Sequence, residues 1–163
     1  MNNSYQPTPE DIRFMRRAVA LSVENVANGG GPFGAVIVKD GEIIAEGVNR
    51  VTANNDPTAH AEVTAIRAAC ARLETFQLDD CVIYTSCEPC PMCLSAIYWA
   101  GISKIFYGNT KKDADKINFG DDFIYEEIAK PYAARRIPMM QLLREESLAA
   151  FRAWEENPDK IEY

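Results

Sequence analysis

The sequence predicts a single α/β domain built around a layered sheet in which at least some strands are parallel. Segments with strand-like and helix-like patterns alternate along the chain, and this order favours helices packed on such a sheet. With 163 residues, of which 47% are hydrophobic, the chain is long enough to bury a core without disulfides. It contains no internal repeat, low-complexity tract or linker, so we expect one domain over residues 1–163.

A helix and a hairpin are expected in the first third of the chain. Residues 8–11 combine a capping hydroxyl, a proline and two acids, which suit a helix start, and apolar residues then recur at helical spacing until three consecutive glycines. The apolar runs 35–38 and 43–45 flank the turn dipeptide Asp40-Gly41 and predict two strands joined as a hairpin.

The middle of the chain predicts two helices, each followed by a strand. The Ala-rich residues 60–73 have apolar positions near helical spacing, and the apolar run 81–85 is typical of a buried strand. A second helix is expected over residues 91–99, which begin with proline and end just before a glycine, and residues 104–107 predict a further strand.

The last third of the chain is more polar. Residues 109–120 are polar and charged and predict a loop near the end of a strand, a common place for ligand-handling residues. The apolar run 137–143 contains a proline and predicts an edge strand, and residues 145–156 predict a terminal helix.

Composition and charge narrow the class of protein. No window approaches the roughly 18 to 20 apolar residues of a membrane span, and residues 1–7 lack the pattern of a signal peptide, so we expect a soluble, cytoplasmic protein without a membrane partner. Its five cysteines are an odd number and are expected to be thiols or metal ligands. The net charge of -7 weighs against a nucleic-acid partner, because such proteins usually gather a dominant basic surface.

Potential zinc ligands stand near the starts of the two central helices. His60 and Glu62 lie near one helix start, and Cys90 and Cys93 lie near the other, where Pro91 suits the first helical position. Zinc binds imidazole nitrogen and thiolate sulfur, and three protein ligands leave one tetrahedral position open for water, as in a catalytic site. Glu62, two residues from His60, is placed to move protons without binding the metal.

Each part of this pattern also has a simpler interpretation. A lone Cys-x-x-Cys can be a redox pair or half of a structural zinc site, and the only histidine can be an ordinary core residue. Cys87 forms a second Cys-x-x-Cys with Cys90, and a fourth ligand would make the site structural. The combined pattern, His-x-Glu with Pro-Cys-x-x-Cys, resembles the zinc-deaminase signature and selects Cys90 and Cys93. Cys70 and Cys81 are expected to be packing residues.

Over nearly its whole length the sequence resembles the cytidine-deaminase-like superfamily and, within it, the bacterial guanine deaminases. The resemblance is carried by residues 31–38, 55–63, 85–93, 119–125 and 161–163. It implies a three-layer α/β/α sandwich with a central mixed five-stranded sheet, one zinc ion per chain, and conversion of guanine to xanthine and ammonia.

The resemblance also implies the chemistry of the metal site. His60, Cys90 and Cys93 would bind zinc, which lowers the pKa of its water so that hydroxide can attack the amino-bearing C2 of the purine. Glu62 would accept the water proton and protonate first ring N3 and then the departing amine. The backbone N–H of Ala61 is a candidate for polarising or positioning the reacting atoms.

Further residues are implied in purine binding. Asn49 matches the family position that hydrogen-bonds the purine, and its amide can donate and accept. Asp121 matches the purine-recognising aspartate and is preferred to Asp122, because a carboxylate accepts from guanine N–H groups and so favours guanine over adenine. Phe33 and Phe119 can supply apolar faces against the ring, or they can equally be core residues.

The C-terminus implies an oligomer. Tyr163 matches the family's terminal tyrosine, which reaches an active site from the partner subunit after exchange of the C-terminal segment. A homodimer is therefore expected, in which a segment from about residue 145 to residue 163, with Phe151 and Trp154, covers the partner's pocket.

Other functions remain open at this point. A tRNA adenosine deaminase uses the same zinc centre, and Arg16-Arg17 and Arg135-Arg136 are candidate phosphate contacts whose simpler interpretation is solvated surface charge. Related pockets can also deaminate another free base or an aminotriazine. A noncatalytic, zinc-stabilised interaction protein would have no need for Glu62 beside an open metal position.

Overall fold

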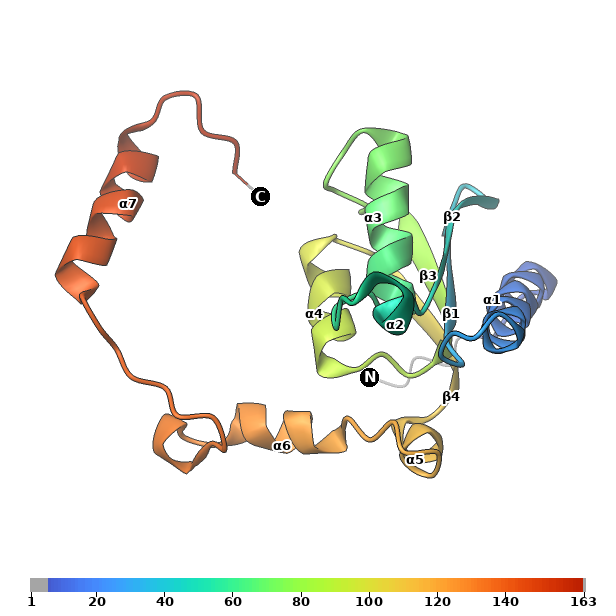
Figure 1. Cartoon of the computed structure of the whole chain (residues 1–163). Coiled ribbons are helices and arrows are strands. Elements are labelled where there is room, and N and C mark those ends of the chain that lie inside the picture. Colours follow the sequence, from blue (N-terminus) through green and yellow to red (C-terminus); the bar gives the residue numbers. More distant parts are fainter. Residues whose placement is uncertain (1–5, 163) are drawn as a thin grey trace. The chain divides into compact units, whose positions relative to one another are not determined.

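A four-stranded mixed sheet is the centre of the first of two units in the computed structural model, which describes residues 6–162 (Figure 1). The units are Met1–Ile124 and Tyr125–Tyr163. The strands are β1 (Gly34–Lys39), β2 (Glu42–Val48), β3 (Cys81–Cys87) and β4 (Lys104–Asn109), in the order β2-β1-β3-β4. β1 is antiparallel to β2 and β3, whereas β4 is parallel to β3. β2, β3 and β4 therefore run in the same direction and end at the same edge of the sheet.

The hairpin between β1 and β2 confirms the prediction from the turn dipeptide. Asp40 and Gly41 both have a positive φ, 51° and 77°, as the two central residues of a type I′ turn do. This turn matches the twist of the flanking strands and sets Lys39 opposite Glu42.

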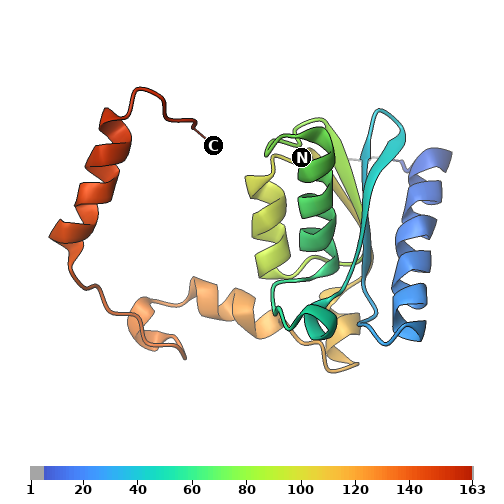
Figure 2. The ribbon, with the colours of Figure 1, turned by 45° about the horizontal axis from the view of Figure 1, so that its top comes forward.

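Helices cover both faces of the sheet (Figure 2). α1 (Pro9–Ala27) packs on one face, and α3 (Ala61–Leu73) packs on the other with α4 (Pro91–Trp99) beside it. β1 is buried on both faces, since Val36 belongs to the apolar cluster under α1 and Ile37 to the cluster under α3. This double burial explains the continuous apolar run in the sequence. Among residues 6–162, no helix is both long and apolar enough to cross a membrane.

The start of α1 also confirms the prediction. The Thr8 hydroxyl accepts a hydrogen bond from the N–H of Asp11 at 3.1 Å, and the Asp11 carboxylate accepts one from the N–H of Thr8 at 2.7 Å. The Asp11 carboxylate also accepts from the hydroxyl of Tyr84 on β3 at 2.6 Å. The capping box therefore ties the first helix to the sheet.

Residues 109–120 are not the plain loop that their polarity predicts. They contain the short helix α5 (Lys111–Asp115), which Thr110 and Asp113 stabilise with a second capping box. The Thr-x-x-Asp pattern provides partners for N–H groups at a helix start, so one helical turn forms without an apolar stripe. A further short helix, α2 (Val51–Asn54), follows β2 and was not predicted either.

The C-terminal unit contains no strand among the residues that the structure describes. α6 (Asp122–Ala129) leads into it and is followed by the 3-10 helix η1 (Tyr132–Ala134) and by α7 (Arg144–Glu156), which confirms the predicted terminal helix. The edge strand predicted at 137–143 is wrong for this chain: the segment is largely exposed and pairs with no strand, and its proline lacks an N–H for a ladder. The described sheet therefore has four strands, instead of the five that the family resemblance implies.

Candidate active site and metal centre

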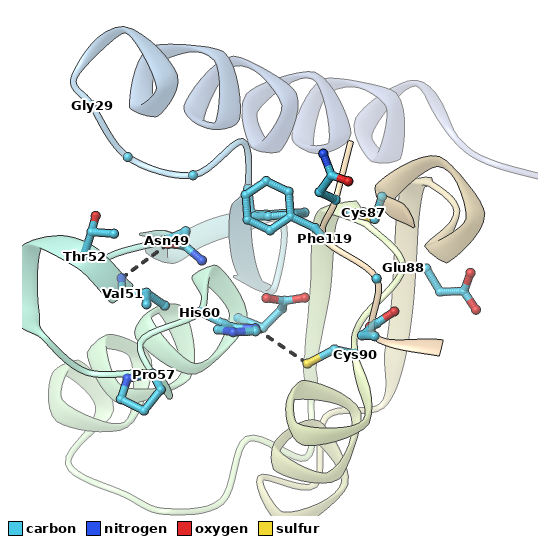
Figure 3. A pocket seen from close by; sticks show the side chains of 18 residues that line it. Gly29, Asn49, Val51, Thr52, Pro57, His60, Cys87, Glu88, Cys90 and Phe119 are labelled. Carbon is cyan, nitrogen blue, oxygen red and sulfur yellow. Dashed lines mark hydrogen bonds between the residues drawn. The ribbon is translucent and has the colours of Figure 1, made fainter. Parts of the chain in front are cut away.

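The predicted metal ligands meet where β2, β3 and β4 end. α3 and α4 begin at this same edge, with His60 as the N-cap of α3 and Cys90 as the N-cap of α4 (Figure 3). Cys93 lies in the first turn of α4. The order β2-α3-β3-α4-β4 returns the chain to this edge after each crossover. The crossovers therefore bring His60 to Cys90 and Cys93, which lie 30 and 33 residues further along the sequence.

The geometry of these three residues fits a zinc ion. Nδ1 of His60 is 3.6 Å from Sγ of Cys90 and 3.5 Å from Sγ of Cys93, and the three atoms lie within 4.8 Å of one another. A tetrahedral zinc with bonds of about 2.0 Å to nitrogen and about 2.3 Å to sulfur separates such ligand atoms by roughly 3.6 Å. The donor set and its spacing therefore match zinc with three protein ligands.

Hydrogen bonds within this group shift the proton affinities of its members. A hydrogen bond with Cys93 and a weaker effect of the hydrogen bond with His60 hold the pKa of Cys90 well below that of an ordinary thiol. The hydrogen bond between His60 and Cys90 also raises the pKa of His60. In addition, the backbone N–H of Cys93 donates to Sγ of Cys90 at 3.5 Å. Cys90 is thus stabilised as the thiolate, the form that binds zinc.

Glu62 lies beside the metal ligands and is only 6% exposed. It is the second residue of α3, and burial raises the pKa of its carboxyl group. Thr85 on β3 donates its hydroxyl to Oε1 of Glu62 at 3.3 Å, which holds one carboxyl oxygen in place. A carboxyl group with a raised pKa is suited to take up and release a proton near neutral pH.

A cavity of about 570 Å³ opens beside the metal ligands, and all of its lining residues belong to the first unit. Among them are Asn49 and Phe119 (Figure 3) and also Phe33 and Asp121. The rings of Phe33 and Phe119 meet edge to face, with centroids 5.1 Å apart and 86° between the ring planes. Phe33 also packs against the core, whereas Phe119 remains 47% exposed, so both rings form pocket wall and only Phe33 is also a core residue.

Asp121 and Asp122 have different surroundings. Oδ1 of Asp121 is buried and has no hydrogen-bond partner within the described chain. Asp122 is instead paired with Lys111, whose Nζ is 2.7 Å from Oδ1 of Asp122. Burial, followed by the charge of Cys90, raises the pKa of Asp121. An acceptor without a protein donor at the wall of a cavity is suited to accept from a ligand.

Asn49 directly follows β2 and is 8% exposed. Its Oδ1 accepts from the N–H of Val51 at 3.3 Å (Figure 3). This bond fixes the orientation of the amide, because only its oxygen can accept. The amide therefore lines the cavity in a defined orientation.

One predicted position does not line this pocket, another lies outside the described residues, and two residues of the site were not predicted. Ala61 is fully buried at the first position of α3 and is not among the lining residues, and Tyr163 lies outside the described residues. Cys87 lines the pocket without joining the ligand group, and burial raises its pKa to about 11. Thr85 and Cys87 both lie on β3, shortly before Cys90 in the chain. The sequence signal that could have pointed to them is the apolar run that predicts a buried strand here.

Comparison with known proteins gives a consistent result. Residues 8–109 match the family cytidine and deoxycytidylate deaminase zinc-binding region. The chain is 60% identical over 151 residues to a guanine deaminase of Bacillus subtilis (strain 168), covering 92% of this chain and 97% of that protein. An X-ray structure of guanine deaminase from Bacillus subtilis matches with a TM-score of 0.91 at 59% identity, over 93% of this chain and 98% of that chain. A tRNA-specific adenosine deaminase of Aquifex aeolicus (strain VF5) is 41% identical over 99 residues, which are 61% of this chain and 66% of that protein.

Proposed function

The chain belongs to the cytidine and deoxycytidylate deaminase family, and we propose that it hydrolyses guanine to xanthine and ammonia in a zinc-dependent reaction. The observation that carries this proposal is a group of three zinc ligands beside a pocket that is lined by two of them, by a buried glutamate and by an aspartate with an unpartnered oxygen. The 60% identity to a guanine deaminase, over 92% of the chain, selects guanine among the substrates of the family.

The chemistry requires a nucleophilic water and a group that moves its protons. Held by His60, Cys90 and Cys93, zinc supplies a Lewis acid that makes water acidic enough to react near neutral pH. Glu62 accepts a proton from the attacking water and delivers it to ring N3 as the amino-bearing C2 takes up the oxygen. Glu62 then carries the remaining hydroxyl proton to the amine, so that the C2–N bond breaks, ammonia leaves and the carbonyl group of xanthine forms.

Purine recognition is proposed to rest on the polar and aromatic lining of the pocket. Asp121 accepts from guanine N–H groups, a role supported by its buried, unpartnered Oδ1. Asn49 binds the purine through its oriented amide, and Phe33 and Phe119 lie against the ring. Adenine has no N–H at ring N1 to give to Asp121, which is the physical reason for the preference for guanine.

Ammonia release from guanine by the zinc-loaded protein tests this function, with adenine, cytosine, an aminotriazine and a tRNA anticodon stem-loop assayed in parallel. We expect ammonia and xanthine from guanine in equal amounts. Turnover of the RNA alone, with binding that weakens steeply as salt rises, would replace guanine deamination with tRNA adenosine deamination. Turnover of only another free base would change the substrate, and a fully zinc-loaded protein inactive on all of them would favour a noncatalytic role.

The C-terminal unit is proposed to complete the active site of a second copy in a homodimer. Phe151 and Trp154 on α7 are 70% and 42% exposed, as expected of a surface that a partner covers. Tyr163 would then reach the partner's pocket from the end of the exchanged segment.

Deletion of residues 160–163 is expected to lower guanine turnover on the order of 10- to 100-fold, because a group that positions the substrate is lost while the metal ligands stay in place. Zinc content, measured by atomic absorption, should stay at one ion per chain. Unchanged turnover would contradict this role of the C-terminus.

A mixing experiment separates exchange between subunits from a role within one subunit. The Glu62→Gln variant keeps its C-terminus, and the truncated chain keeps Glu62, so a mixed dimer would contain one complete site. Co-refolding equal amounts is expected to restore about a quarter of the wild-type sites. Absence of any recovery, with mixed dimers demonstrated by differently tagged chains, would contradict the exchange.

The enzyme is proposed to work in the cytoplasm. Zinc binding requires the sulfur atoms of Cys90 and Cys93 to stay reduced, which a reducing compartment ensures. All five cysteines are free in the structure, in agreement with such a compartment.

A further inference from the structure

The last turn of α1 carries a buried asparagine that the proposed mechanism does not use. Asn25 is 6% exposed. Its Nδ2 donates to the carbonyl oxygen of Gly31 at 2.8 Å and to the carbonyl oxygen of Asn49 at 2.9 Å. Only the amide nitrogen can donate to two carbonyl groups, so the orientation of this side chain is unambiguous. Asn25 therefore joins the glycine segment and Asn49, two parts of the pocket wall that lie on different segments of the chain.

The glycine segment 29–31 is shaped around these two asparagines. A Cβ atom on Gly30 would lie 2.3 Å from Nδ2 of Asn25, and one on Gly31 would lie 3.1 Å from Cγ of Asn49. The N–H of Gly30 also donates to the backbone oxygen of Asn25 at 2.8 Å. The absence of side chains thus lets the segment wrap closely around the Asn25 amide while it forms one wall of the cavity.

Asn49 is held on three sides. Asn25 donates to its carbonyl oxygen, its own N–H donates to the carbonyl oxygen of Phe33 at 3.1 Å, and its Oδ1 accepts from Val51. The backbone bonds fix the Cα of Asn49, and the bond from Val51 fixes its amide. Without the Asn25 donor, a buried carbonyl oxygen would lose its partner and the residue could shift.

We propose that Asn25 is a positioning residue for substrate binding, which sets the place of Asn49 and of the glycine wall without touching the purine itself. This inference rests on the proposed guanine deaminase function and deepens it. The amide of Asn25 donates to the backbone of Gly31 and of Asn49, and not to a zinc ligand or to Glu62, so it acts on the affinity for guanine and not on proton transfer.

The Asn25→Asp variant tests this role, because it keeps the size of the side chain and removes both amide donors. We expect the KM for guanine to rise on the order of tenfold, with kcat within about a factor of three of wild type and one zinc ion per chain. Asn28→Asp is the matched control, since Asn28 is an exposed asparagine at the same helix end and receives the same charge. It should leave KM unchanged.

A purely structural role makes a different prediction. Partial unfolding would lower the active fraction, and with it kcat and zinc content, while KM stayed at the wild-type value; that result would overturn the proposal. An unchanged KM in a well-folded, active Asn25→Asp variant would overturn it as well. Neither result would affect the proposed function, which the wild-type assay with guanine decides independently.

Two further measurements keep the test decisive if Asn25→Asp does not fold. Gly30→Ala places a methyl group where the Asn25 amide lies and leaves every hydrogen-bonding group present, so it should raise KM in the same way. If Asn25 acts through Asn49, Gly30→Ala should raise KM much less in the Asn49→Ala background than in the wild-type background. Equal effects of Gly30→Ala in the two backgrounds would refute the proposal that Asn25 acts through Asn49.

Discussion

The Glu62→Gln variant is expected to bind one zinc ion per chain and to lose guanine turnover by about three orders of magnitude. Glutamine has nearly the size of glutamate and can still accept a hydrogen bond from Thr85, but it cannot take a proton from water. Because Glu62 is outside the group of metal ligands, the loss should appear in kcat while zinc content is unchanged. Steady-state kinetics and atomic absorption on the same preparation measure both quantities.

A matched control separates proton transfer from a general effect on α3. Glu74→Gln makes the same chemical change at the exposed C-terminal end of this helix and should keep full turnover. If Glu62→Gln kept more than about a tenth of wild-type activity, general acid-base catalysis by this residue would be contradicted. Loss of zinc from the variant would instead indicate that the carboxylate contributes to metal binding.

The Cys93→Ala variant is expected to lose both zinc and guanine turnover. Cys93 is fully buried in the first turn of α4, and its sulfur is one of the three donors that surround the metal position. Two ligands bind zinc much more weakly than three, so turnover should return only partly, if at all, when zinc is added in excess. The melting temperature should also fall, because zinc bound to the folded state connects the starts of two helices.

Two other cysteines provide the controls for this prediction. Cys70→Ala changes a half-buried cysteine of α3 that packs against the core and should keep zinc and turnover. Cys87→Ser tests the competing Cys-x-x-Cys, and its zinc content should stay at one ion per chain, because Cys87 is not in the ligand group. A fall in zinc content for Cys87→Ser, with Cys93→Ala still binding zinc, would show that the ligand set is wrong.

The zinc ligands could be predicted from the sequence because metal chemistry restricts both residue type and spacing. A Cys-x-x-Cys at a helix start and a His-x-Glu at another leave few alternatives once they occur together. The helices and the hairpin were predictable for a similar reason, since caps, turn residues and apolar periodicity are local signals.

The residues proposed to bind the purine show the limit of local sequence signals. Asn49 and Asp121 carry no pattern of their own, and only the resemblance to a family pointed to them. The structure distinguishes Asp121 from its neighbour, because Lys111 pairs with Asp122 and leaves an oxygen of Asp121 without a partner. Such pairing depends on which side chains the fold brings together, and adjacent residues of the same type cannot be separated by sequence alone.

By itself, the sequence determined the zinc donor set, the position of Glu62 beside it and most helices and strands, because these depend on residue type and short spacing. The tertiary structure decided which donors converge, since β2, β3 and β4 end at one edge where α3 and α4 begin. It also decided that the predicted strand at 137–143 has no partner within the described chain and that Asn25 reaches the pocket wall. Strand partners and buried hydrogen bonds of this kind join segments far apart in the chain, and no local pattern encodes them.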